Sequence, residues 1–246
     1  SNSGWASGSA GIGLRGLSQK NTLVLLNGRR LANYGFPAGG LSDTFVNLNA
    51  LPLVAVERIE VLKDGASAVY GSDAVAGVVN IITRQNFQGL EVGGSYGTSD
   101  EGGLDTRRAR LVGGIGDLDA DGYNLLVSVE AFDRDRLDQN QRDLTASGIY
   151  SDLPGGRWNG WSAKGARFLV GGRSVPFLDA AGNCPEGMTL TPSAPIDGLA
   201  GDTCAINLAP YTTLIPSTER YHAFVNGTVR LTDDVDLFGE ALVSQI

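Results

Sequence analysis

The segment 56–84 places two strand patterns around a connector punctuated by glycine, and this order restricts the fold more than any other part of the chain. Val56–Leu62 interleaves β-branched and charged residues, as a half-exposed strand does. Residues 63–65 read Lys-Asp-Gly and supply a turn, and residues 78–83 form a second, nearly apolar strand. Between the strands, Ala66–Tyr70 predicts one short helical turn that ends at a glycine.

Two further motifs precede this segment in a fixed order. Residues 14–16 read Leu-Arg-Gly, and residues 22–30 read TLVLLNGRR. Together with the segment 56–84, they resemble the plug domain of TonB-dependent outer-membrane receptors. The resemblance implies a plug domain of mixed α+β structure inside an antiparallel transmembrane β-barrel of about 22 strands. It also implies ligand-gated, energy-coupled import of a scarce nutrient, such as a siderophore, vitamin, sugar or peptide, across the outer membrane of a Gram-negative bacterium.

After residue 86 the chain changes to apolar residues that alternate with small or polar ones. This period of two predicts strands with one apolar and one polar face. We expect five consecutive antiparallel strands of one curved sheet, at residues 88–98, 106–117, 121–135, 219–232 and 235–246. Alternation alone does not distinguish a soluble sandwich from a membrane barrel.

The connections between these strands favour the barrel. Most are a few residues long, but residues 137–217 are rich in Gly, Pro and Asp, and such a length is abnormal within a compact domain. Outer-membrane barrels alternate short periplasmic turns with long extracellular loops. We therefore expect a plug domain at 1–86, incomplete at its N-terminus, and the first five barrel strands at 87–246 with an extracellular loop at 137–217.

In a membrane barrel the apolar face must meet lipid, because a charge at the lipid-facing midplane costs roughly 2 to 4 kcal/mol. Alternation assigns the outer face to Leu125, Val127, Val129, Val225, Val229, Leu231, Leu237 and Val243. It assigns the lumen to Glu130, Arg134, Asn226, Arg230 and Glu240.

The net charge of -8 and the pI near 4.6 argue against a nucleic-acid partner, which requires a basic footprint. The partners implied by the resemblance are outer-membrane lipid, a small extracellular ligand, and the TonB energy-coupling protein through a segment that this chain lacks. The sequence contains no apolar run of about 18 residues, so it predicts no transmembrane helix.

The two cysteines, Cys184 and Cys204, lie in the same polar stretch. An even pair in a loop indicates a disulfide, which would require an oxidising compartment such as the periplasm or the cell surface. Two free thiols are the alternative. A zinc site has less support, because two cysteines without nearby histidine do not complete four ligands.

The candidate site residues follow from the resemblance. Arg15 and Lys63 stand where plug motifs carry basic residues that pair with carboxylates of the barrel wall. The expected ligand-contact residues, at the outward apex of the plug or in adjacent turns, are Trp5, Gln19, Lys20, Tyr34 and Phe36. The aromatic residues could instead pack beneath neighbouring loops.

No catalytic site, metal or cofactor is predicted. Residues 11–16 read GIGLRG and match the dinucleotide-binding glycine pattern, but a strand rather than a helix follows them. The single histidine, His222, points inward by alternation and lacks a paired carboxylate or second ligand. Two other classes stay open: a surface receptor that binds or signals without transport, and a soluble β-sandwich enzyme.

Overall fold

The computed structural model describes residues 9–35, 44–148, 161–162, 167–192 and 201–246. The chain divides into two compact units. Unit 1 comprises Ser1–Gly97, Thr106–Arg134 and Thr218–Ile246, and unit 2 comprises Thr98–Asp105 and Asp135–Ser217.

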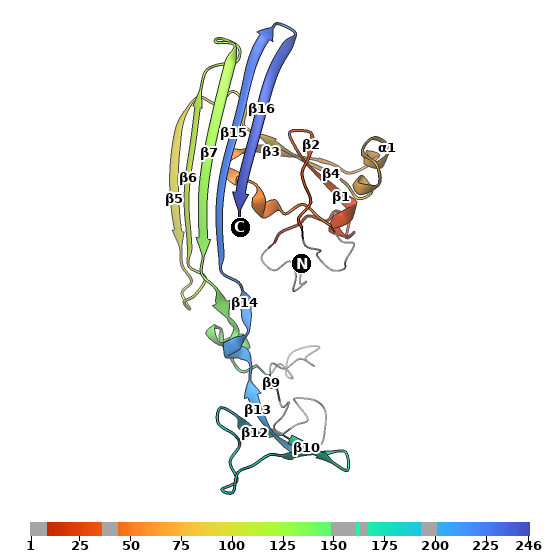
Figure 1. The fold of residues 1–246 in the computed structure, drawn as a ribbon, viewed down its shortest axis with the longest axis vertical. Helices are drawn as coiled ribbons and strands as arrows, with labels where there is room; N and C mark the ends of the chain where they lie inside the picture. Colours follow the sequence, from red (N-terminus) through yellow and green to blue (C-terminus); the bar gives the residue numbers. More distant parts are fainter. Residues whose placement is uncertain (1–8, 36–43, 149–160, 163–166, 193–200) are drawn as a thin grey trace. The chain divides into compact units, whose positions relative to one another are not determined.

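A four-stranded sheet forms the centre of the N-terminal domain in unit 1 (Figure 1). Its strands are β1 (Thr22–Leu26), β2 (Arg29–Arg30), β3 (Val56–Leu62) and β4 (Gly77–Thr83), in the order β2-β1-β4-β3. β1 is parallel to β4, whereas β2 and β3 are antiparallel to their neighbours. All five residues of β1 are buried, as expected for a central apolar strand that is covered on both faces.

The turn between β1 and β2 consists of Asn27 and Gly28, with φ angles of 48° and 79°. Both angles lie in the left-handed region, which the Asn-Gly pair of a tight hairpin adopts readily. The Asn27 carboxamide accepts a hydrogen bond from the Thr83 backbone N–H at 2.9 Å and donates one to the Thr83 hydroxyl at 2.8 Å. The turn is therefore fastened to β4 by side-chain as well as backbone groups.

One short α-helix, α1 (Ala66–Tyr70), follows β3 and confirms the helical turn predicted there. The N–H of Gly71 donates to the carbonyl of Ser67 and ends the helix. The 3-10 helices of this domain are η1 (Gln19–Asn21), η2 (Leu48–Ala50), η3 (Leu53–Ala55) and η4 (Ser72–Ala74). No helix in the described ranges combines the length and the apolar character needed to cross a membrane.

The apolar alternation of β1 and β4 supplies two cores, one on each face of the N-terminal sheet. Leu23, Leu25 and Val78 pack with Ala66 of α1 and Ala74 of η4 on one face. The other face packs against η3 and against a second sheet; its buried residues are Val24, Leu26, Leu51, Val54, Ala55, Val79, Ile81, Val112, Leu126 and Phe224. The N-terminal sheet is thus covered by its own helices on one face and by another part of the chain on the other.

That second sheet contains the five strands predicted from alternation, all antiparallel, in the order β16-β15-β7-β6-β5. The strands are β5 (Gly89–Gly97), β6 (Thr106–Ile115), β7 (Tyr123–Arg134), β15 (Thr218–Thr232) and β16 (Val235–Gln245). The sheet is curved, and the N-terminal domain lies on its concave side (Figure 1). β7 pairs directly with β15, although the 83 residues 135–217 lie between the two strands in the sequence.

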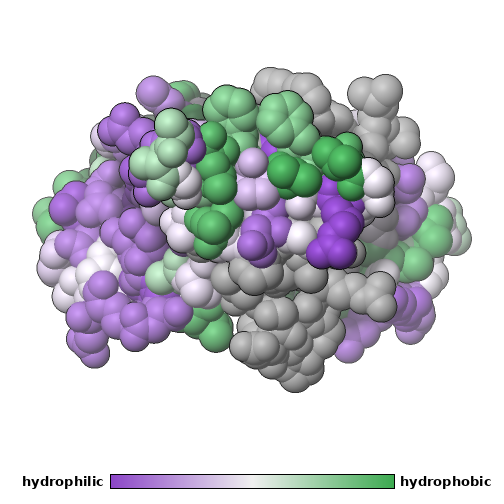
Figure 2. Space-filling model, turned by 90° about the horizontal axis from the view of Figure 1, so that it is seen from below, coloured by the Kyte–Doolittle hydropathy of each residue, from purple (hydrophilic) through white to green (hydrophobic). Residues whose placement is uncertain are grey.

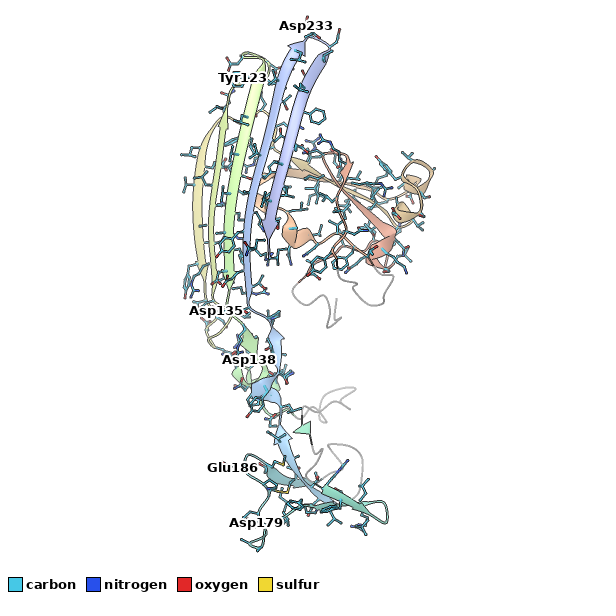
Figure 3. All side chains as sticks on the ribbon, viewed as in Figure 1. Tyr123, Asp135, Asp138, Asp179, Glu186 and Asp233 are labelled. Carbon is cyan, nitrogen blue, oxygen red and sulfur yellow. A yellow bond between two sulfur atoms is a disulfide. The ribbon has the colours of Figure 1, made fainter. Side chains whose placement is uncertain are left out.

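Side chains project from both faces of the five-stranded sheet (Figure 3). On the outer face, the eight apolar residues assigned to it by alternation are all exposed, from Val127 at 36% to Val243 at 69%. On the inner face, Glu130 and Asn226 are buried, at 4% and 8%. The inner face is not uniformly polar as predicted, because Leu126 on it is buried against the N-terminal domain.

The turn between β6 and β7 is held by Asp117, whose carboxylate accepts backbone hydrogen bonds from Asp119 at 2.8 Å and Ala120 at 3.1 Å. These bonds lower the pKa of the Asp117 carboxyl below its ordinary value, and the bond from Asp119 has the largest effect. A carboxyl with a lowered pKa stabilises the turn at pH values above its unfolded-state pKa. This contribution is lost as the pH falls through the folded-state pKa.

Tyr123, which begins β7, lies at the same end of the sheet as Asp233 (Figure 3).

Unit 2 contains most of the segment that the sequence predicts as a long loop, and the structure gives it short strands and helical turns of its own. The strands of its described residues form three small sheets. The elements there are β8 (Leu137–Asp138), η5 (Gln139–Gln141), α2 (Asp143–Ala146), β9 (Trp161–Ser162), β10 (Arg167–Val170), β11 (Arg173–Pro176), β12 (Thr189–Pro192), β13 (Asp202–Asn207), η6 (Ala209–Tyr211) and β14 (Thr213–Ile215).

A disulfide joins Cys184 to Cys204 of β13, with an S–S distance of 2.13 Å and a Cα–Cα distance of 5.5 Å. It closes a loop with a sequence separation of 20 residues.

Phe168 and Leu169 of the β10–β11 hairpin are exposed. Figure 2, seen from below, shows a face on which hydrophobic residues lie beside hydrophilic ones.

Candidate functional site

The surface between the N-terminal domain and the inner face of the five-stranded sheet is the candidate functional site. An apolar centre and several polar contacts hold the two parts together, among them the contacts of Glu240 and Arg220. At the centre, Phe224 of β15 is fully buried and belongs to one core with Val54 and Ala55 of η3. Burial of such a side chain favours association of the two parts but does not fix their relative orientation, because the hydrophobic effect is non-directional. The directional polar contacts define that orientation.

The first polar contact is centred on Glu240 of β16. One carboxylate oxygen accepts hydrogen bonds from the side chains of Asn27 and Asn226, and the other pairs with Arg29 at 2.9 Å. The Arg29 guanidinium also lies 4.3 Å from the centre of the Phe238 ring. A single, largely buried carboxylate of the five-stranded sheet therefore binds the β1–β2 turn of the N-terminal domain.

The second polar contact joins Arg220 of β15 to Asn49 of η2. The Arg220 Nη1 donates a hydrogen bond of 2.8 Å to the Asn49 side-chain oxygen. The neighbouring Asn47 accepts a hydrogen bond from the Asn49 backbone N–H at 3.1 Å, which orients this short helix. Movement of η2 would thus disturb a charged group of the five-stranded sheet.

Beside these contacts, a cavity of about 430 Å³ lies between the N-terminal domain and β16. Tyr34, Asn47 and Leu51 line it from one side, and Leu242 and Ser244 line it from the other. The Tyr34 ring packs against Phe45 with a centroid distance of 5.6 Å. Among the predicted ligand-contact residues that the structure describes, Tyr34 borders this cavity.

The other predicted site residues are placed elsewhere. Gln19 and Lys20 line a smaller cavity of about 120 Å³ within the N-terminal domain, and Trp5 and Phe36 lie outside the described residues. Arg15 forms an ion pair with Asp64 of its own domain, whereas Lys63 is exposed. Pairing of Arg15 and Lys63 with wall carboxylates stays a prediction.

His222, the single histidine, is buried on the inner face of β15. Its Nδ1 lies 3.0 Å from the Ser244 hydroxyl of β16, and it lies opposite Glu130 of β7 in the strand register. This hydrogen bond links one ring nitrogen to the neighbouring strand.

Replacing Glu240 by glutamine is expected to loosen the β1–β2 turn without unfolding the sheet. Glutamine retains an acceptor for Asn27 but removes the charge that pairs with Arg29, and a hydrogen bond to a charged group contributes about 1.5 to 3 kcal/mol. Hydrogen–deuterium exchange of residues 22–31 in the full-length protein should therefore accelerate.

The matched control is Asp236→Asn, which removes a carboxylate of the same strand that pairs with Arg230 of β15 at 3.4 Å. This variant should leave exchange of residues 22–31 unchanged. Equal acceleration in both variants would show that the Glu240 carboxylate does not specifically stabilise the β1–β2 turn.

The sequence does not reveal the partners in these contacts. The Asn27-Gly28 turn is recognisable from its residue types, and Glu240 is assigned to the inner face by alternation. However, 211 positions separate Arg29 from Glu240, and 171 separate Asn49 from Arg220. Nothing in their local sequence shows that these residues meet.

The chain is similar to known proteins over part of its length. Residues 1–78 match the family described as TonB-dependent Receptor Plug Domain. The vitamin B12 transporter BtuB of Vibrio vulnificus is 35% identical over 119 residues, which are 47% of this chain and 18% of the transporter. This chain therefore covers less than a fifth of that relative's length.

A solved structure shows a similar fold. The siderophore receptor PirA from Acinetobacter baumannii aligns with a TM-score of 0.53 and 16% identity, covering 98% of this chain and 26% of the receptor. The siderophore receptor PirA from Pseudomonas aeruginosa aligns with a TM-score of 0.46 and 19% identity, covering 95% of this chain and 28% of the receptor. The N-terminal domain matches the plug-domain family over residues 1–78, and the chain is similar to part of a TonB-dependent receptor.

Proposed function

We propose that this chain is the plug and the first part of the barrel wall of an outer-membrane transporter that imports a scarce nutrient. The observation that carries the proposal is the packing of the plug on the inner face of a sheet whose outer face is apolar and exposed. Such an outer face is suited to lipid, and a plug on the opposite face would obstruct the lumen.

The proposed orientation follows from the lengths of the connections. The β6–β7 and β15–β16 turns are short and would face the periplasm, whereas the long connection at 137–217 would be an extracellular loop. The exposed Tyr123 and Tyr221 lie near opposite ends of the apolar outer face, where aromatic residues mark the two membrane interfaces. We propose the inner face, and the cavity beside Tyr34, as the path along which the ligand reaches the plug.

Transport requires the plug to be displaced and to return. A plug held by a few charged and polar contacts can be released by a pulling force, which the TonB energy-coupling protein would supply. The Glu240 and Arg220 contacts are suited to this role, because they are directional and lie at the edges of the apolar centre. No catalytic residue or cofactor is assigned.

The test is uptake by the full-length receptor in a Gram-negative host that lacks its own receptors for the probes. Labelled cyanocobalamin and a panel of ⁵⁵Fe-loaded siderophores, including ferric citrate, would be supplied with and without TonB. Accumulation of one probe that requires TonB supports transport. Surface binding without accumulation in either host would instead favour a receptor that binds or signals without transporting.

A further inference from the structure

The inner face of the five-stranded sheet carries a concentration of arginine beside the plug contact. Strand register places inward-facing residues of β6, β7 and β15 directly opposite one another. Three successive rows are Thr106, Arg134 and Thr218; Arg108, Phe132 and Arg220; and Arg110, Glu130 and His222. We call Arg108, Arg110, Arg134 and Arg220 the arginine cluster.

The charge of this surface is opposite to that of the whole chain. The three rows hold four arginines and one glutamate, whereas the chain carries a net charge of -8. Guanidinium groups gathered on one wall repel one another, most strongly where water is partly excluded. An anion bound among them would offset this repulsion.

Two members of the cluster are held in position by an aromatic ring. The guanidinium carbons of Arg220 and Arg108 lie 4.5 Å and 5.2 Å from the centre of the Phe132 ring, which stands between them in the register. Stacking on an aromatic face restricts the side chain and leaves the edge of the guanidinium free to form hydrogen bonds. Glu130, which is buried, lies 3.8 Å from the Arg108 Nε.

A glycine on the neighbouring strand makes room for a third arginine. Gly93 of β5 lies opposite Arg110, and a Cβ atom at Gly93 would lie 2.6 Å from the Arg110 Nε. Any larger residue would push the Arg110 side chain away. The Arg110 side chain therefore occupies the space that a side chain at position 93 would fill.

Arg220 retains a hydrogen-bond donor after its contact with the plug. Its Nη1 donates to Asn49, but its Nε is buried and has no hydrogen-bond partner among the described residues. A buried donor without an acceptor is costly, and charged donors are the most costly. A ligand oxygen that reached this side of the guanidinium would satisfy it.

We infer that the arginine cluster is a binding site for an anionic ligand that carries carboxylate or phosphate groups. Arginine forks recognise the paired oxygens of both groups. The inference deepens the proposed function and rests on it, because it assigns a chemical class to the transported ligand. Since Arg220 also donates to Asn49 through Nη1, the bound anion and the plug would share this guanidinium.

The test uses the full-length receptor purified in detergent, with citrate as the carboxylate probe and pyrophosphate as the phosphate probe. Calorimetry should show binding of at least one probe, weakened as NaCl is raised. The double variant Arg108→Gln/Arg220→Gln should raise the Kd of that probe at least tenfold. The matched control Arg107→Gln, on the outer face of the same strand and paired with Asp133, should leave the Kd unchanged.

Heat-modifiable mobility on gels would establish that each variant retains a folded barrel. If neither probe binds, or if the double variant binds as tightly as the unaltered receptor, the inference is wrong. If the double variant does not fold, Arg110→Gln alone decides in the same assay. TonB-dependent uptake without anion binding would overturn this inference and leave the proposed function intact, whereas anion binding without uptake would do the reverse.

Discussion

Replacement of Val127 by arginine should prevent most of the full-length protein from assembling in the membrane. Val127 is exposed on the outer face of β7, midway along the apolar band between Tyr123 and Ala131. Ala131 lies opposite Tyr221, so the two tyrosines flank the band. A charge at the bilayer midplane costs about 2 to 4 kcal/mol on the lipid face of a barrel.

The matched control places the same arginine at the edge of the band, as Tyr221→Arg, where the cost falls to about 0 to 1 kcal/mol. Urea unfolding of the full-length receptor in phospholipid vesicles would measure both changes. The comparison also discriminates between membrane and soluble proteins, because an exposed substitution on a soluble β domain usually changes stability by less than about 0.5 kcal/mol. Equal, small effects of the two arginines would refute the membrane assignment.

Much of the fold could be predicted from the sequence because it depends on local patterns. Alternation over residues 121–135 predicts β7 (Tyr123–Arg134) and its two faces, since successive side chains of a strand point in opposite directions. The short helix α1 (Ala66–Tyr70) could likewise be predicted, because the glycine after it marks its end.

The rest depends on contacts between distant residues. Val112, Leu126 and Phe224 lie on the face predicted to be polar, yet they are buried because the plug covers them there. Alternation gives the face on which a residue lies but not what covers that face. For the same reason, the sequence identifies Arg220 and Glu240 as residues of the five-stranded sheet without revealing Asn49 and Asn27 as their partners.

Phe224 is the residue whose truncation should most weaken the seating of the plug. It is fully buried, and it packs in one core with Val112 and Leu126 of the wall and with Leu51 and Val54 of the plug. Truncation of a buried phenylalanine to alanine costs about 3 to 5 kcal/mol, because contacts are lost and a cavity remains. Much of this cost should fall on the contact between plug and wall, since Phe224 belongs to one part and η3 to the other.

Phe238→Ala is the matched control. Phe238 lies on the inner face of β16 but is 54% exposed, and its truncation removes the cation–π contact with Arg29, worth about 0.5 to 1 kcal/mol at an exposed site. In the full-length receptor, limited proteolysis should cleave the plug of Phe224→Ala much faster than that of Phe238→Ala, while heat-modifiable mobility reports an intact barrel in both. If the two plugs are cleaved at the same rate, the apolar centre does not hold the plug. The polar contacts, which include those at Glu240 and Arg220, would then have to hold it.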